Sequence, residues 1–136
     1  MECLPVRAKE LIVVVTSVGT EDQALDVAHA LIRNRQAACV NIIQGVQSVY
    51  RWKGRVCVDG EWLLLIKTVA SEFEGIRETI QKVNTYELPE VLAYRVDYAS
   101  DGFGNWIARM TERPKKRISG ARSKGRRPTA VTTIAR

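Results

Sequence analysis

The stretch LIVVVTSVGTEDQALDVAHALIRN, residues 11–34, contains the signals of a strand and of a helix in succession. It begins with mostly β-branched residues followed by Gly19, which is typical of a strand that ends in a turn. Thr20 precedes Gln23 by three residues, a capping-box spacing that satisfies free N–H groups and opens a helix. Apolar side chains then recur at helical spacing, so the stretch predicts one strand followed by one amphipathic helix ending near Asn34.

The rest of the chain repeats these signals. Two turn signals, KG at residues 53–54 and DG at residues 59–60, separate two apolar strands and predict an antiparallel hairpin. Ser71 and Glu74 have the spacing of a second capping box. The other predicted elements are strands over 39–46 (continued by 49–52), 61–68 and 91–98, a second helix ending near residue 84, and a closing helix over 103–110 that Pro114 stops.

This order of elements predicts the fold class. Right-handed crossovers turn the order β-α-β-β-α-β into an α+β, ferredoxin-like sandwich, here with an extended hairpin between the second and third strands and a C-terminal helix.

The strands carry apolar side chains on both faces. In residues 11–15 and again in 62–66, apolar residues occupy odd and even positions alike. A ferredoxin-like sheet packs its two long helices on one face. If about five such side chains stayed in water on the other face, the fold would lose roughly 1.5 to 3 kcal/mol of stabilisation for each. We therefore predict that another subunit buries the second face. The alternative is cover by the closing helix alone, which with about ten residues is short for four strands.

Charge divides the 136 residues into two parts. Residues 1–113 hold all fifteen acids against thirteen Lys and Arg, whereas residues 114–136 hold eight Lys and Arg and no acid. The sequence thus predicts one domain over 1–113 and a basic tail over 114–136, expected to be disordered. Nucleic acid or anionic lipid would be contacted only through this tail. The phosphate-contact candidates are Lys115, Lys116, Arg117, Arg126 and Arg127.

Cysteine and motif content limits the possible chemistry. Cys3, Cys39 and Cys57 form an odd set without CxxC spacing, and the N-terminus has no signal-peptide pattern, so we expect a cytoplasmic protein. With His29 as the single histidine, a complete zinc site has few possible ligands. No phosphate-loop, dinucleotide, zincin or hydrolase motif occurs, and no apolar run is long enough for a membrane span. We predict a protein without enzymatic activity.

Two segments combine carboxylates with aromatic residues. They are SVYRWKG, residues 48–54, together with Glu61 and Lys67, and TYELPEV, residues 85–91, which includes Glu87 and Glu90. Carboxylates beside aromatic rings at strand ends can ligate a hard cation or shape a cleft, although solvated loop acids remain the alternative. Cys39 is interpreted as a small buried apolar side chain, with a soft-metal ligand as the alternative.

From Leu11 to Ile107 the chain resembles the CutA family of divalent-cation tolerance proteins. The matching segments are VVVTS (13–17), LIRNRQAACVNI (31–42), S-x-Y-x-W-x-G (48–54), E-x-x-L-x-x-K-T (61–68), Y-E-L-P-E (86–90) and W-I (106–107). The resemblance implies a ferredoxin-like fold and a tight homotrimer with sheets at its centre, related in architecture to the PII signalling proteins. Departures are Asn84-Thr85, where the family usually has His-Pro, and Gly104, where leucine is usual.

The resemblance also implies a function. The family is linked to tolerance of copper and other divalent metals, and Cys39 is the matched position among its metal-linked cysteines and histidines. We therefore expect a protein of the metal-ion response that requires no cofactor but binds copper or another divalent cation weakly. The alternative is a PII-like signalling or scaffold trimer that binds a small ligand or protein partners between subunits. The expected residues of these intersubunit clefts are Trp52, Glu61, Lys67, Tyr86 and Glu87.

Overall fold

The computed structural model describes residues 10–114. Its strands form one antiparallel sheet in the order β2-β3-β1-β4, which confirms the predicted ferredoxin-like arrangement. The tail candidates and Cys3 lie outside the described residues. The elements are β1 (Leu11–Val18), α1 (Glu21–Arg33), β2 (Cys39–Trp52), β3 (Arg55–Val69), the 3₁₀ turn η1 (Ala70–Glu72), α2 (Phe73–Val83), β4 (Leu92–Arg95) and α3 (Asp101–Met110).

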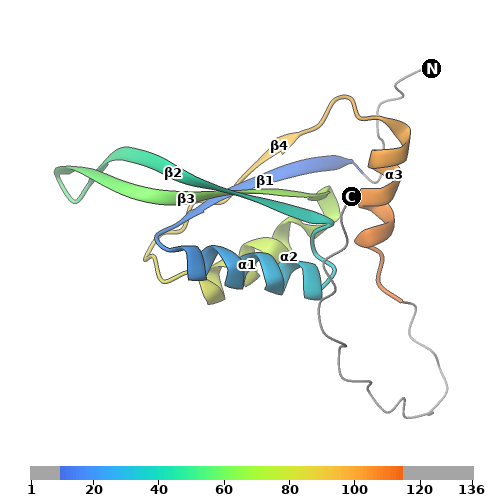
Figure 1. The fold of residues 1–136 in the computed structure, drawn as a ribbon, viewed down its shortest axis with the longest axis horizontal. Helices are drawn as coiled ribbons and strands as arrows, with labels where there is room; N and C mark the ends of the chain where they lie inside the picture. The colour runs from blue at the N-terminus through green and yellow to red at the C-terminus, as the bar shows by residue number, and fades with distance from the viewer. Residues whose placement is uncertain (1–9, 115–136) are drawn as a thin grey trace, which may run out of the picture.

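Helices α1 and α2 pack side by side against one face of the sheet (Figure 1). Every second residue of β1 and β3 points toward these two helices, because the side chains of a strand alternate between the two faces of the sheet. The core formed in this way is continuous and apolar. Its fully buried members include Val14, Val18, Val27, Leu31, Leu64, Ile66, Ile76 and Ile80.

The β2–β3 hairpin extends far beyond the other two strands (Figure 1). Its turn is at Lys53 and Gly54, both with positive φ, as a tight hairpin turn requires. The prediction of a second turn at Asp59 and Gly60 is wrong, because these residues pair with Ser48 and Gln47 inside the ladder. Strand β3 consequently begins at residue 55 rather than 61.

The two predicted capping boxes have different outcomes. The Thr20 hydroxyl accepts a hydrogen bond from the Gln23 backbone N–H at 3.1 Å, as expected, but the Gln23 amide donates to the Thr85 hydroxyl at 3.0 Å instead of returning to residue 20. The second capping box is wrong: Ser71 lies in η1, and α2 begins at Phe73 without a side-chain cap.

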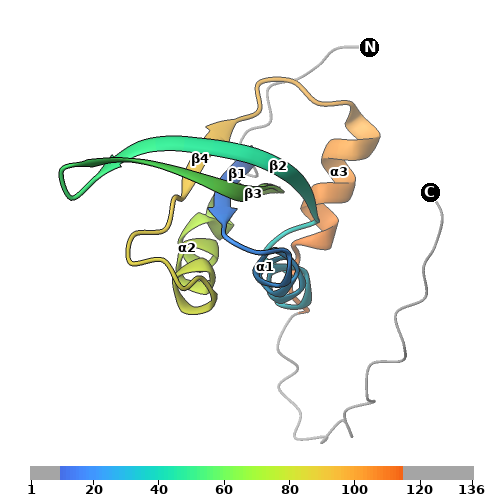
Figure 2. The same ribbon diagram turned by 60° about the vertical axis from the view of Figure 1, so that its left-hand side comes forward.

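Helix α3 covers only one end of the second sheet face. Ile107 packs there with Leu11 and Val69, and all three are buried. Figure 2 shows α3 standing at the end of the sheet opposite to the hairpin tip. Farther along the same face, Leu92 remains 49% exposed and Tyr94 59% exposed. Within one chain, the closing helix therefore leaves most of this face open.

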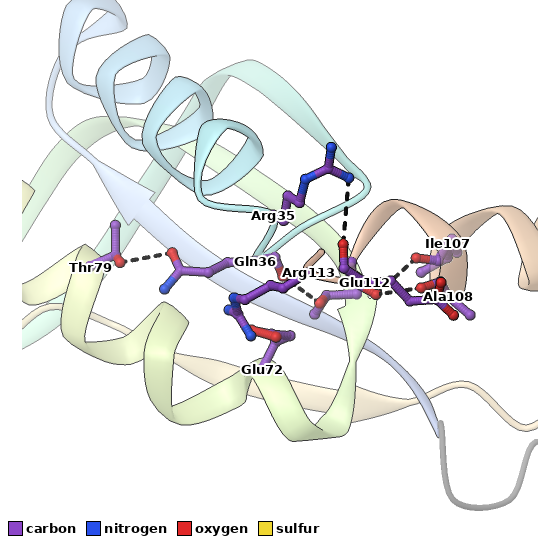
Figure 3. A network of polar contacts seen from close by, with 10 residues as sticks. Arg35, Gln36, Glu72, Thr79, Ile107, Ala108, Glu112 and Arg113 are labelled. Carbon is purple, nitrogen blue, oxygen red and sulfur yellow. Dashed lines mark hydrogen bonds and ion pairs between the residues drawn. The ribbon is translucent and has the colours of Figure 1, made fainter. Parts of the chain in front are cut away.

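Polar contacts hold the C-terminal end of the domain against the helices (Figure 3). Arg113 Nη2 lies 2.7 Å from Glu72 Oε2, and Glu72 is buried. The Gln36 side chain accepts a hydrogen bond from the Thr79 hydroxyl at 2.8 Å, which connects the segment after α1 to α2. Arg35 Nη1 reaches the backbone carbonyl of Glu112 at 3.5 Å. These contacts join three segments that are distant in the sequence.

Candidate functional site

A cavity of about 620 Å³ lies where the hairpin meets the segment after α2. Four of the five predicted cleft residues line it, namely Trp52, Glu61, Tyr86 and Glu87, and so does Glu90. Of the other lining residues, Ser48, Val49, Tyr50 and Leu88 lie in the two segments singled out from the sequence, whereas Ser17 and Leu63 were not predicted as site residues. The cavity thus brings together the two segments that combine carboxylates with aromatic rings.

A hydrogen bond joins two residues that line the cavity, Tyr86 and Glu61. The Tyr86 hydroxyl donates to Glu61 Oε2 at 3.0 Å, and Glu61 is only 9% exposed. The phenol reaches this position because residue 19 is glycine: a Cβ atom there would lie 3.1 Å from the Tyr86 hydroxyl oxygen. Gly19, which the sequence marks as a turn residue, therefore also makes room for a ring from another segment.

Both tyrosines of the cavity are held as phenols. Burial, followed by the hydrogen bond to Glu61, raises the pKa of Tyr86 to about 12. The hydrogen bond to Asp59 raises the pKa of Tyr50 to about 12 as well. Near neutral pH each hydroxyl is therefore a donor, and each carboxylate is an acceptor.

Asn84 positions the segment that carries Tyr86. Its side-chain amide donates to the Ser17 carbonyl at 3.2 Å, and its side-chain oxygen accepts from the Tyr86 backbone N–H at 2.8 Å. Asn84 is 7% exposed, so both bonds are shielded from water. Sequence analysis noted this residue only as a departure from the family pattern, because one chain gives no sign of which distant carbonyl an amide reaches.

An ammonium group lies at the rim of the cavity. Lys53 Nζ stands 5.7 Å from the centroid of the Trp52 ring and 3.4 Å from Glu87 Oε2. The Lys53 and Glu87 side chains are both largely exposed, so their attraction is weakened by solvent. The geometry nevertheless combines a cation–π contact with an ion pair.

Lys67 does not line this cavity within one chain. It pairs with Cys39 across the β2–β3 ladder, six residues along the strand from Glu61, or about 20 Å. Its Nζ lies 5.7 Å from the ring centroid of Phe103 in α3. Lys67 and Cys39 therefore share the open sheet face but occupy its other end.

The described residues do not assemble a metal site. Nowhere in residues 10–114 do three or more His, Cys, Asp or Glu side chains gather so that they could hold a metal ion. Cys39 is half-buried with Lys67 as its cross-strand neighbour, and His29 is exposed on α1. Cys57 is a free, half-buried thiol in the hairpin arm. The described part of one chain therefore supplies single donor groups rather than a coordination sphere.

These features define an α+β protein of ferredoxin-like topology, with a long hairpin and a cavity rich in acids and aromatic rings at its base. Residues 12–110 match the family model described as CutA1 divalent ion tolerance protein. The chain belongs to this family. No helix in the described part of the chain is long and apolar enough to cross a membrane.

Individual relatives agree with this assignment. The chain is 37% identical over 99 residues to a divalent-cation tolerance protein CutA of Thermus thermophilus, covering 73% of this chain and 96% of that protein. It is 37% identical over 100 residues to the chloroplastic protein CutA of Arabidopsis thaliana, covering 74% of this chain and 55% of that protein. The chain thus spans about half the length of its plant and animal relatives.

Solved structures give the same fold. The divalent cation tolerance protein of Thermus thermophilus superposes with a TM-score of 0.73 at 36% identity, covering 75% of this chain and 99% of that one. CutA1 of Oryza sativa superposes with a TM-score of 0.74 at 33% identity, covering 77% of this chain and 96% of that one.

Proposed function

We propose that this protein acts in the cellular response to divalent metal ions as a cytoplasmic homotrimer that binds copper weakly. Membership of the CutA1 divalent ion tolerance family supports the metal-related role. The proposal includes no catalytic step and no required cofactor.

The single observation that carries the proposal is the open apolar face of the sheet. Val15, Leu65 and Leu92 are register partners across three strands, and all three point away from α1 and α2. On the same face, Ile43 of β2 pairs with Leu63 and is 41% exposed. Burying this face against neighbouring subunits would contribute several kcal/mol per chain at roughly 25 cal/mol per Å². A three-fold assembly would place these faces at its centre.

Copper would be the cargo of this protein rather than a resident cofactor. Because residues 10–114 of one chain offer no set of three ligands, binding is expected to be weak and to depend on Cys39. A thiolate is a soft ligand that suits copper, and the half-buried Cys39 lies on the face proposed for subunit contact.

Titration calorimetry with copper(II) tests this part of the proposal. We expect weak, saturable heat for the wild-type chain and loss of that heat in Cys39→Ser. Cys57→Ser is the matched control, because it removes a free thiol from the hairpin arm. Absence of heat in the wild type, or equal heat in Cys39→Ser and the wild type, would exclude copper binding at Cys39.

A further inference from the structure

The charged residues that line the hairpin cavity are all acidic. Three carboxylates, from Glu61, Glu87 and Glu90, face it, and no Lys, Arg or His is among the residues that line it in the described chain. The rings of Tyr50, Trp52 and Tyr86 and the apolar side chains of Val49, Leu63 and Leu88 complete the wall.

Glu61 is the buried carboxylate among the three. It is 91% buried, and its hydrogen bond comes from the neutral Tyr86 hydroxyl through Oε2. Ion pairs join Glu72, Glu74 and Glu87 to Arg113, Arg77 and Lys53, and none of these three pairs reaches Glu61. A buried carboxylate is costly unless further donors or a cation compensate it. The cavity is the direction from which such a group can come.

One cation of the chain, the Lys53 ammonium, already contacts two residues that line the cavity. The ammonium of Lys53 rests against the Trp52 ring and beside Glu87, at distances of 5.7 Å and 3.4 Å. It does so from the rim, where its side chain is 71% exposed, and leaves the interior free. Proteins recognise ammonium groups by aromatic faces, and a carboxylate beside such a face adds an ion pair.

We propose that this cavity binds a small organic cation carrying an ammonium group. The ammonium would donate to Glu61, while the carbon chain packs on Leu63 and Leu88 and extends toward the Trp52 ring. A volume of about 620 Å³ is within the range of small-molecule sites, roughly 300 to 1,000 Å³. A bare divalent ion suits the site less well, because the described residues provide no cluster of three ligands.

Titration of the full chain with putrescine and with tetramethylammonium, at low ionic strength, tests the proposal. Sodium acetate serves as the probe of opposite charge. We expect saturable heat with putrescine, weaker heat with tetramethylammonium, which cannot donate a hydrogen bond, and none with acetate. Glu61→Gln keeps the shape of the site, and we expect it to weaken putrescine binding roughly tenfold or more, as loss of a charge-assisted hydrogen bond does.

The matched control is Glu74→Gln, which removes the same charge from an exposed position on α2 and is expected to leave affinity unchanged. Trp52→Leu provides a second test at a partly exposed site should Glu61→Gln fold poorly, and it is expected to weaken both amines. No saturable heat with either amine at millimolar concentration would overturn the proposal. Equal affinities in Glu61→Gln and Glu74→Gln would overturn it as well.

This inference rests on the proposed function only in requiring that the cavity stays open in the assembly. The two can fail separately. A trimer that binds copper but no amine contradicts the amine site alone. A monomer that binds putrescine through Glu61 contradicts the proposed assembly and keeps the amine site.

Discussion

At the scale of single residues, the candidate site is held together by hydrogen bonds between side chains and segments that are distant in the sequence. Glu61 and Tyr86 are 25 positions apart in the sequence and meet at 3.0 Å. Sequence analysis selected both, Tyr86 within the segment 85–91 and Glu61 as an acid grouped with the segment 48–54. It could not select Asn84 or Ser17, because their role comes from a hydrogen bond between segments 67 positions apart.

Replacement of Asn84 by alanine tests this positioning role. Two hydrogen bonds would be lost, one to the Ser17 carbonyl and one from the Tyr86 N–H. We expect the free energy of unfolding to fall by about 1 to 3 kcal/mol in urea denaturation. Asn105→Ala, at an exposed position of α3, is the control and should change stability by less than about 0.5 kcal/mol. Equal stability of the two variants would contradict the positioning role.

The raised pKa of Tyr86 predicts a stability change at alkaline pH. Its folded-state pKa of about 12 lies above the ordinary value of 10.0, so the unfolded chain releases this proton first as the pH rises. The contribution of Tyr86 to stability is therefore complete below about pH 10 and is lost as the pH approaches 12. We expect the stability difference between wild type and Tyr86→Phe to shrink over that range.

Spectrophotometric titration of phenolate absorbance provides the direct check. Tyr86→Phe should lose part of the absorbance change that the wild type shows above about pH 11. Tyr98→Phe, which removes an exposed phenol before α3, is the control for loss of one ring elsewhere. An unaltered late titration in Tyr86→Phe would contradict a raised pKa at Tyr86.

At the scale of elements, the sequence predicted the type and order of every α-helix and strand in the described residues, because periodicity depends on neighbouring residues alone. Its errors fell where partners distant in the sequence decide the structure. The Asp59-Gly60 pair is typical of a turn, yet pairing with β2 keeps both residues in strand β3. Ser71 has the spacing of a cap, yet a 3₁₀ turn precedes α2, and the neighbouring Glu72 is buried against Arg113.

Helix α3 is expected to be held mainly by Ile107. This side chain is 4% exposed and packs against Leu11 and Val69 at the end of the sheet. Ile107→Ala should lower the free energy of unfolding by about 2 to 5 kcal/mol, measured by chemical denaturation, because it removes buried methylenes and leaves a cavity. Ile32→Ala makes the same change at a 43% exposed position of α1 and should cost clearly less. Similar losses in both variants would contradict the packing role of α3.

At the scale of the whole molecule, charge separates the domain from the basic tail. Residues 114–136 carry eight Lys and Arg without an acid. If the tail contacts phosphates, DNA binding should weaken steeply as salt increases, and truncation after Arg113 should abolish it. Fluorescence anisotropy with a labelled duplex measures both effects. Binding that survives the truncation would assign it to the domain instead.

Assembly is the property that the whole-molecule argument depends on most. The sheet has one face covered by α1 and α2, while on the other face α3 covers only one end. Sequence analysis could predict this two-sided pattern from the absence of apolar–polar alternation in β1 and β3. It could not predict the geometry between subunits, because one chain contains no information on how its copies are oriented.

Light scattering coupled to size-exclusion chromatography, at micromolar concentration, tests the assembly most directly. We predict a mass three times that of the 15.3 kDa chain for the wild type. Leu65→Lys, which puts a charge at the centre of the open face, should shift it toward the mass of one chain. A wild-type protein that elutes as a stable, fully folded single chain would contradict the proposal that this face is buried between subunits.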